Sequence, residues 1–153
     1  MITVDRTSLL VEVEASVRLG ECEDTLRAGG LTLGVDPVDR DATVGEWLAR
    51  GADGAPDSWS DPADHLVAGI QATMKDGRRL SIRPAPRRAV GPDLIALLVG
   101  MRGRFATIER AWLRVHSAAG DRARVHPLAY DRDPAVGEDE SRLLDAIERE
   151  LRS

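Results

Sequence analysis

The feature that most constrains this chain is an Asp-Gly pair, Asp76-Gly77, set between two β-prone runs. The runs extend from His65 to Met74 and from Arg79 to Arg83, with only a short polar connection between them. Asp-Gly readily adopts the positive φ angles that tight hairpin turns require. The sequence therefore predicts that Ile70 to Met74 and Leu80 to Arg83 pair as antiparallel strands.

Hydrophobic periodicity and turn residues predict further elements along the chain. The predicted strands are 2–4 and 9–15, joined as a hairpin around Asp5 to Ser8, then 31–33, 105–115 and 124–130. In the strand 105–115, one face is expected to carry Ala106, Ile108, Arg110, Trp112 and Arg114. The predicted helices are 20–28, ended by Gly29-Gly30; a helix capped by Thr43 and closed by Gly51; 94–99, ended by Gly100; and 137–151.

This mixture of hairpins and helices predicts an α+β domain with a largely antiparallel sheet and flanking helices. A length of 153 residues fits a single compact unit. We expect residues 1–116 to form its body. Residues 117–153 are expected to add a strand and an amphipathic helix to the same domain, with Leu143, Leu144, Ile147 and Leu151 on one stripe.

Aromatic residues are scarce, at 3% of a chain that is 42% hydrophobic. The core must therefore consist of Leu, Val, Ile and Ala side chains. Each tryptophan can bury a large apolar area. We expect Trp47, Trp59 and Trp112 to be anchor points.

Charge and cysteine content limit the classes of partner. A net charge of −5 and an isoelectric point near 5.2 disfavour nucleic acid and anionic lipid as partners. A basic run could bind an anion, but a solvated face is the commoner use of such residues: Arg78, Arg79, Arg83, Arg87 and Arg88. Without a signal sequence, a second cysteine beside Cys22 or an apolar run of bilayer length, the expectation is a cytoplasmic protein with no membrane span.

Catalytic groupings are not evident in the sequence. The histidines, His65, His116 and His126, have neither an i, i+4 metal spacing nor a cysteine pair nearby. Cys22 falls in a predicted helix without a basic partner and is interpreted as a buried apolar residue. We therefore predict no catalytic residue and no metal ligand.

Several short motifs follow one another in a characteristic order between Asp41 and Val115. They are Thr43-Val44-Gly45-Glu46-Trp47-Leu48-Ala49-Arg50-Gly51-Ala52-Asp53-Gly54, Asp64 to Ile70 with Asp76-Gly77-Arg78, Gly91-Pro92-Asp93-Leu94 with Leu97 to Gly100, and Gly100 to Glu109. This succession resembles the second half of the FAD-binding domain of the vanillyl-alcohol-oxidase and p-cresol-methylhydroxylase type. Upstream, Val11 to Leu33 resembles the family's Val-x-Val-x-Ala-Gly-Val strand and the helix after it, with Ser16 in place of the glycine.

The resemblance implies an FAD site in which the start of the capped helix and its glycines let backbone amides approach the cofactor. The matching positions are Thr43, Gly45, Gly51, Gly54, Gly91, Asp93, Gly100, Gly103 and Ile108. Where the family has Gly-Gly, this chain has Gly45-Glu46, and the carboxylate would repel a phosphate. Ala106 replaces a further family glycine, and Arg104-Phe105 replaces Thr-Leu.

The family's pyrophosphate-loop subdomain and catalytic cap have no counterpart in this sequence, so we do not expect an isolated redox enzyme. The first hypothesis is a non-catalytic binding or assembly module that forms a homo-oligomer or binds a protein partner. The second is an FAD-binding subunit of a split flavin-dependent oxidoreductase. The third is an unrelated α+β regulatory module.

Overall fold

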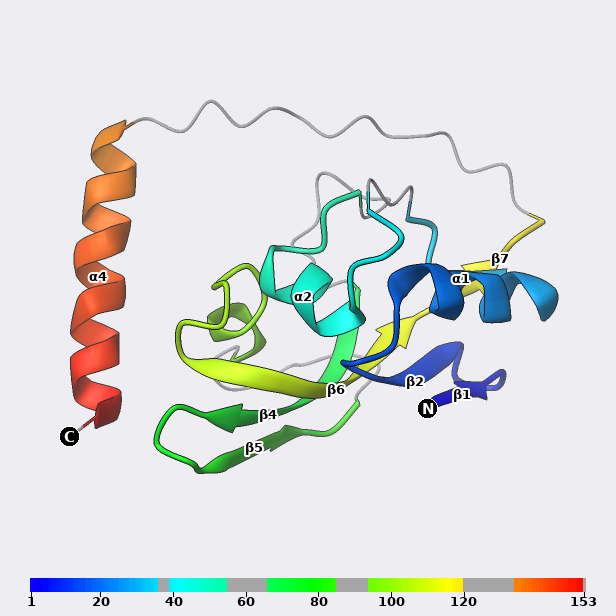
Figure 1. Ribbon diagram of the computed structural model, residues 1–153, viewed down its shortest axis with the longest axis horizontal. Helices are drawn as coiled ribbons and strands as arrows, with labels where there is room; N and C mark the ends of the chain where they lie inside the picture. Colours follow the sequence, from blue (N-terminus) through cyan, green and yellow to red (C-terminus); the bar gives the residue numbers. More distant parts are fainter. Residues whose placement is uncertain (36–38, 55–65, 85–93, 120–133, 153) are drawn as a thin grey trace.

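The computed structural model describes residues 1–35, 39–54, 66–84, 94–119 and 134–152 (Figure 1). Within the last range it describes the side chains of Glu138 and of residues 141–152. The elements in chain order are β1 (Ile2–Asp5), β2 (Leu10–Glu14), α1 (Leu19–Ala28), β3 (Leu31–Thr32), α2 (Val44–Ala49), β4 (Val67–Met74), β5 (Arg79–Ile82), η1 (Leu94–Leu97), β6 (Ala106–Arg114), β7 (His116–Ser117) and α4 (Pro134–Arg152).

Five strands form one antiparallel sheet in the order β1-β2-β6-β4-β5, and β3 pairs with β7 in a separate two-stranded sheet. The predicted hairpin is confirmed, because Ile70 pairs with Ile82 and Thr73 with Arg79. Gly77 has φ +86°, the positive angle that the turn was predicted to need. The α+β class and the largely antiparallel sheet are therefore as predicted from sequence.

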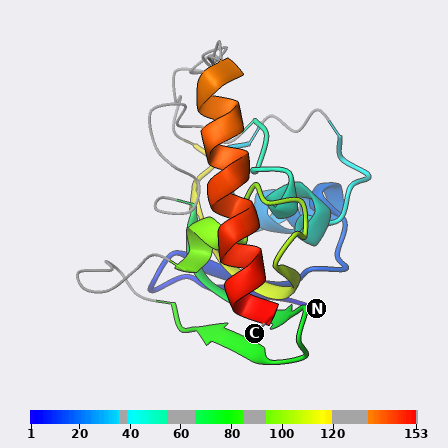
Figure 2. The same ribbon diagram turned by 90° about the vertical axis from the view of Figure 1, so that its left-hand side faces the viewer.

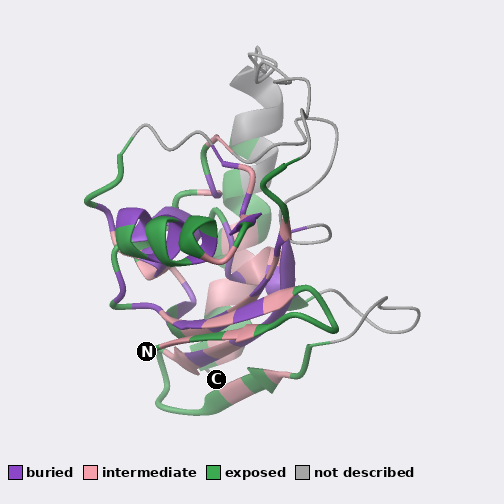
Figure 3. Cartoon of the chain, turned by 90° about the vertical axis from the view of Figure 1, so that its right-hand side faces the viewer, coloured by how far each residue is buried: buried purple, intermediate pink, exposed green. Residues whose placement is uncertain are grey.

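The core lies between this sheet and the helices α1 and α2, which cover one of its faces (Figure 1). Trp47 of α2 is 2% exposed, and its indole Nε1 donates to the carbonyl of Asp53 at 2.9 Å. Strand residues Val13, Ile70 and Leu113 are fully buried beneath the helices. Figure 3 shows the buried residues concentrated in α1, α2 and the strands, whereas α4 has none among its described side chains.

The structure tests the anchor prediction for only one of the other two tryptophans. Trp112 is only half-buried, because its face of β6 is turned away from the helices. Trp59 lies outside the described residues.

The predicted side-chain alternation of β6 is wrong. Ala72 pairs with Ile108 but its neighbour Gln71 pairs with Arg110, so Glu109 is an extra residue, a β-bulge. The bulge shifts the alternation by one position. Ala106 and Ile108 consequently share the buried face with Ala111 and Leu113, while Arg110, Trp112 and Arg114 are on the other face.

The predicted helix 94–99 is a single 3₁₀ turn instead, limited to η1. The amides of Leu98 and Val99 both donate to the carbonyl of Ile95. The next amide, that of Gly100, turns away and donates to Leu48 in α2 at 2.9 Å. This tertiary hydrogen bond ends the turn before an α-helix can continue.

Helix α4 stands at one side of the body (Figures 1 and 2). Leu144, Ile147 and Leu151 are half-buried, but Leu143 is 60% exposed, so the predicted four-residue stripe is only partly turned inward. The predicted strand 124–130 lies outside the described residues, and the division at 116 and 117 remains a prediction. Along the described ranges, no helix has the length and apolarity that crossing a bilayer requires.

Leu113→Ala should lower the free energy of unfolding by about 2–5 kcal/mol, because it leaves a cavity at a fully buried position of the central strand. Urea denaturation followed by circular dichroism measures this loss. Leu80→Ala on the edge strand β5, where the side chain is half-buried, is the control and should cost clearly less. Equal losses in the two variants would contradict the position of β6 at the centre of the core.

Candidate functional site

The start of helix α2 is closed by a capping box. The Thr43 hydroxyl accepts a hydrogen bond from the amide of Glu46 at 3.2 Å, and the Glu46 carboxylate accepts one from the amide of Thr43 at 3.0 Å. The sequence supports this locally, since Thr at the N-cap with Glu at the third helical position is the spacing of a capping box.

The remaining amides at this helix start also have protein acceptors. Val44 donates to the carbonyl of Val17 at 2.8 Å, and Gly45 donates to the carbonyl of Ala15 at 2.9 Å. A helix start normally leaves four amides without intrahelical acceptors, and such amides can bind anions. Here all four of them donate to groups of the protein itself.

Glu46 places a negative charge at this point. The amide and hydroxyl of Thr43 lower the pKa of the Glu46 carboxyl below its usual value. A carboxyl with a lowered pKa is ionised at neutral pH. The helix start is therefore occupied by the carboxylate of its own chain.

Gly45 is required by packing. A Cβ atom at this position would lie 2.8 Å from the Cβ of Ala15 and 3.2 Å from its carbonyl oxygen. The absence of a side chain thus lets α2 approach the segment that follows β2. The sequence had associated this glycine with cofactor approach, and the structure shows that the protein's own backbone makes a close approach there.

The opposite end of α2 meets the loop after η1. Gly51 and Gly100 both have positive φ angles, and a Cβ atom on Gly100 would lie 3.6 Å from the Cα of Gly51. The carbonyl of Leu48 accepts from the amides of both glycines, and that of Ala49 accepts from Arg102 at 2.7 Å. The two loops therefore satisfy the C-terminal carbonyls of α2.

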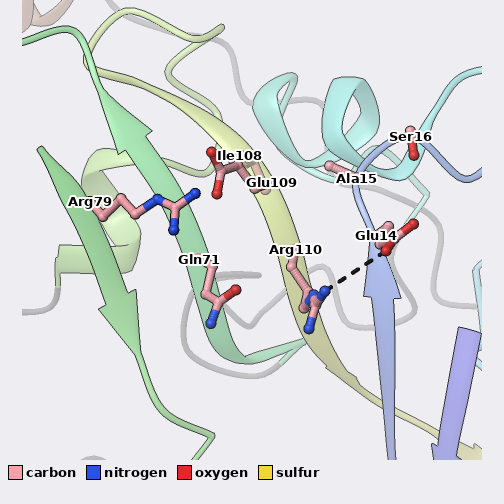
Figure 4. A pocket seen from close by; sticks show the side chains of 8 residues that line it. All are labelled: Glu14, Ala15, Ser16, Gln71, Arg79, Ile108, Glu109 and Arg110. Carbon is pink, nitrogen blue, oxygen red and sulfur yellow. Dashed lines mark ion pairs between the residues drawn. The ribbon is translucent and has the colours of Figure 1, made fainter. Parts of the chain in front are cut away.

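A pocket of about 480 Å³ lies between β5, β4, β6 and the end of β2 (Figure 4). The bulge at Glu109 is part of its wall, as expected of an irregularity that re-aims side chains. The residues that line the pocket are Glu14, Ala15, Ser16, Gln71, Arg79, Ile108, Glu109 and Arg110. Since Ala15 also contacts the position of Gly45, the pocket adjoins the start of α2.

Three charged groups of the pocket have partners, most of which lie outside its lining. Arg110 lies 2.6 Å from Glu12 and 3.8 Å from Glu14, and Glu109 accepts from the Thr73 hydroxyl at 2.6 Å. The N-terminal ammonium group lowers the pKa of Glu14. Arg79 is exposed, and its side chain extends into the pocket (Figure 4). The pocket is therefore lined by both acidic and basic side chains.

The structure places the predicted site residues in three separate groups. Thr43 and Gly45 lie at the start of α2, Ile108 lines the adjoining pocket, and the remaining described positions lie at or beyond the other end of α2: Gly51, Gly54, Gly100 and Gly103. Gly91 and Asp93 lie outside the described residues. Sequence reasoning had not assigned the pocket residues Glu14, Ala15, Ser16, Gln71 and Arg79 to the site. Ser16, at a family glycine position, was the signal that could have indicated them.

The departure Arg104-Phe105 has a structural role. The Arg104 guanidinium donates to Asp145 and, at 3.0 Å, to Glu148 of α4, and it lies 5.8 Å from the centre of the Phe105 ring. Both acids raise the pKa of Arg104, Glu148 through its hydrogen bond most of all. Arg104 therefore links the C-terminal helix to the body, and its guanidinium lies over the Phe105 ring.

Comparison with known proteins agrees with this architecture. The family described as FAD binding domain matches residues 1–83, more than half of the chain, and the protein belongs to that family.

Two curated relatives and two solved structures are particularly informative. The FAD-linked oxidoreductase YgcU of Escherichia coli is 27% identical over 75% of this chain, and the D-lactate dehydrogenase of Archaeoglobus fulgidus is 28% identical over 74%. This chain spans 24% and 26% of those proteins, respectively. Two structures of alkyldihydroxyacetonephosphate synthase share the fold, with TM-scores of 0.63 and 0.62 and sequence identities of 23% and 26%. The matched region covers 75% and 74% of this chain, and 20% and 22% of the synthase chains.

The family implies FAD, and the residues present can be compared with that cofactor. A phosphate at the start of α2 would meet the ionised Glu46 carboxylate and amides that already have acceptors. Bringing a second anion there costs Coulomb energy and leaves hydrogen bonds to be exchanged. The helix start in this chain therefore does not fit a phosphate group.

Gly45→Ala should lower the free energy of unfolding by about 1–3 kcal/mol, because the added methyl group overpacks the contact with Ala15. Gly29→Ala is the matched control, since its Cβ would lie 2.7 Å from the far end of the flexible Arg6 side chain and 3.3 Å from the carbonyl oxygen of Leu26. Combining Gly45→Ala with Ala15→Gly should recover part of the loss. Thermal unfolding measures all three, and a Gly45→Ala protein as stable as the control would show that α2 does not pack as described.

Proposed function

We propose that this chain is a non-catalytic binding or assembly module built on the FAD-binding fold. The observation that carries this proposal is the apolar face of α4, which the body covers only in part. Leu143 is 60% exposed, and Leu144, Ile147 and Leu151 remain half-buried. An apolar helix face that is left open is a common site of association.

The attachment of α4 to the body includes a cluster of ion pairs around Arg104. Asp145 and Glu148 both contact Arg104, and Glu148 also pairs with Arg152 at 2.5 Å. These groups keep solvent contact, so each pair contributes little stability. They orient the helix and leave its Leu143 side available to a partner. A second copy of the chain, related by a two-fold axis, is the partner that we propose.

Leu143→Glu should weaken self-association by about tenfold or more, which corresponds to about 1.4 kcal/mol. Sedimentation equilibrium measures the dissociation constant. Leu9→Glu is the matched control: it makes the same replacement at another exposed leucine, 47% exposed in the turn between β1 and β2. A wild-type chain that sediments only at its monomer mass of 16.6 kDa would contradict the proposal, as would equal effects of the two variants.

The proposal includes that the isolated chain holds no stoichiometric FAD. The closed start of α2 supports this part of it. The cytoplasmic location and the lack of nucleic-acid and membrane partners remain predictions from charge and composition.

Titration calorimetry with FAD should show no saturable binding of micromolar or higher affinity, the range that corresponds to about −8 kcal/mol or more negative. The reason is that charge repulsion and occupied donors oppose the pyrophosphate at α2. Flavin absorbance after purification is an independent readout. A yellow protein, or a saturable titration at sub-micromolar concentration, would contradict this part of the proposal.

The alternative is an FAD-binding subunit of a split flavin-dependent oxidoreductase, completed by another polypeptide. The pocket that contains Ile108 next to the start of α2 favours it, and relatives such as YgcU are named FAD-linked oxidoreductases. Flavin absorbance that appears only when a second polypeptide is present would select this alternative. The third hypothesis, an unrelated α+β regulatory module, is wrong because the chain belongs to the FAD-binding-domain family.

A further inference from the structure

We infer that Glu46 acts as a built-in anion, closing the start of α2 so that this segment folds without a phosphate-bearing ligand and excludes one. The inference rests on the proposed lack of FAD affinity in the isolated chain. It assigns a specificity role to a residue that stands where the family resemblance has the second glycine of a Gly-Gly pair.

The hydrogen bonds at the helix start support this role. The Glu46 carboxylate accepts a hydrogen bond from the amide of Thr43, and the Thr43 hydroxyl accepts one from the amide of Glu46. The amides of Val44 and Gly45 donate to the carbonyls of Val17 and Ala15, respectively. A glycine at 46 would leave the Thr43 amide without this acceptor, and a bound anion or water would have to replace it.

The surrounding charges agree with a self-contained arrangement. Arg50, one turn further along α2, lies 3.6 Å from Asp39. Arg50 lowers the pKa of Glu46 and Asp39 raises it, so the two act in opposite directions on this carboxyl. The negative charge of Glu46 is therefore held mainly by the hydrogen bonds of Thr43.

Helix α1 provides an internal comparison. Its N-cap is Arg18, which makes no side-chain capping bond, and Glu21 occupies the third helical position that Glu46 occupies in α2. The helix dipole favours the negative charge of both acids at this position. Only Glu46 has a reciprocal Thr partner, which separates the capping role from the general effect of charge.

The experiment compares Glu46→Ala, Glu46→Gln and the control Glu21→Ala by urea denaturation. Each protein is measured alone, with FAD and with inorganic pyrophosphate. Glu46→Ala should raise the unfolding equilibrium constant about five- to thirtyfold, the range for loss of a helix cap. Glu46→Gln should stay within about threefold of wild type, because Gln can complete a capping box. Glu21→Ala should also change it less than about threefold.

For the wild-type chain, the urea midpoint should be the same with FAD, with pyrophosphate and without either, whereas pyrophosphate should raise the midpoint of Glu46→Ala, which lacks the carboxylate. A wild-type midpoint raised by pyrophosphate would overturn the inference, because it would show an anion bound in the folded state. Equal stabilities of Glu46→Ala and Glu21→Ala would overturn it as well. Saturable FAD binding by wild type would instead contradict the proposed lack of cofactor affinity, and the oligomeric state measured with Leu143→Glu is independent of both results.

Discussion

Strand β6 is the element on which the rest of the structure depends, because it pairs with β2 on one side and β4 on the other. Ala111 and Leu113 point from it into the core beneath the helices. Beyond the paired segment, the amide of Ala15 still donates to the carbonyl of Glu109, so the chain after β2 is fixed to β6. The bulge at Glu109 thereby shapes the pocket and sets the position against which α2 packs.

Helix α2 shows how residues of a cofactor-binding family can be held by requirements of the fold. Gly45 allows the helix to lie against Ala15, and Gly51 and Gly100 let two loops meet at the other end. These contacts explain the glycines without a ligand. The capping box adds a further step in this chain, because Glu46 supplies an acceptor where the family pattern has a glycine.

One departure from the family pattern, Arg104-Phe105, is connected with the C-terminal helix. Arg104 and Phe105 replace smaller or neutral residues, and the Arg104 guanidinium contacts two carboxylates of α4. The same segment includes Gly100, which is bonded to α2. A single loop thus contacts both α2 and α4, the helix that we propose for assembly. Substitutions that look unfavourable for a flavin are favourable for this contact.

The sequence by itself determined the elements whose signals act over a few residues: the hairpin at Asp76-Gly77, the cap at Thr43, and the α+β class. Only the tertiary structure decided the bulge at Glu109, the pocket, and the acceptors of the Val44 and Gly45 amides. Arg110 and its ion-pair partner Glu12 are 98 positions apart, and no local periodicity specifies such a pairing. Register between distant strands follows from packing of the whole sheet, which one segment's pattern does not contain.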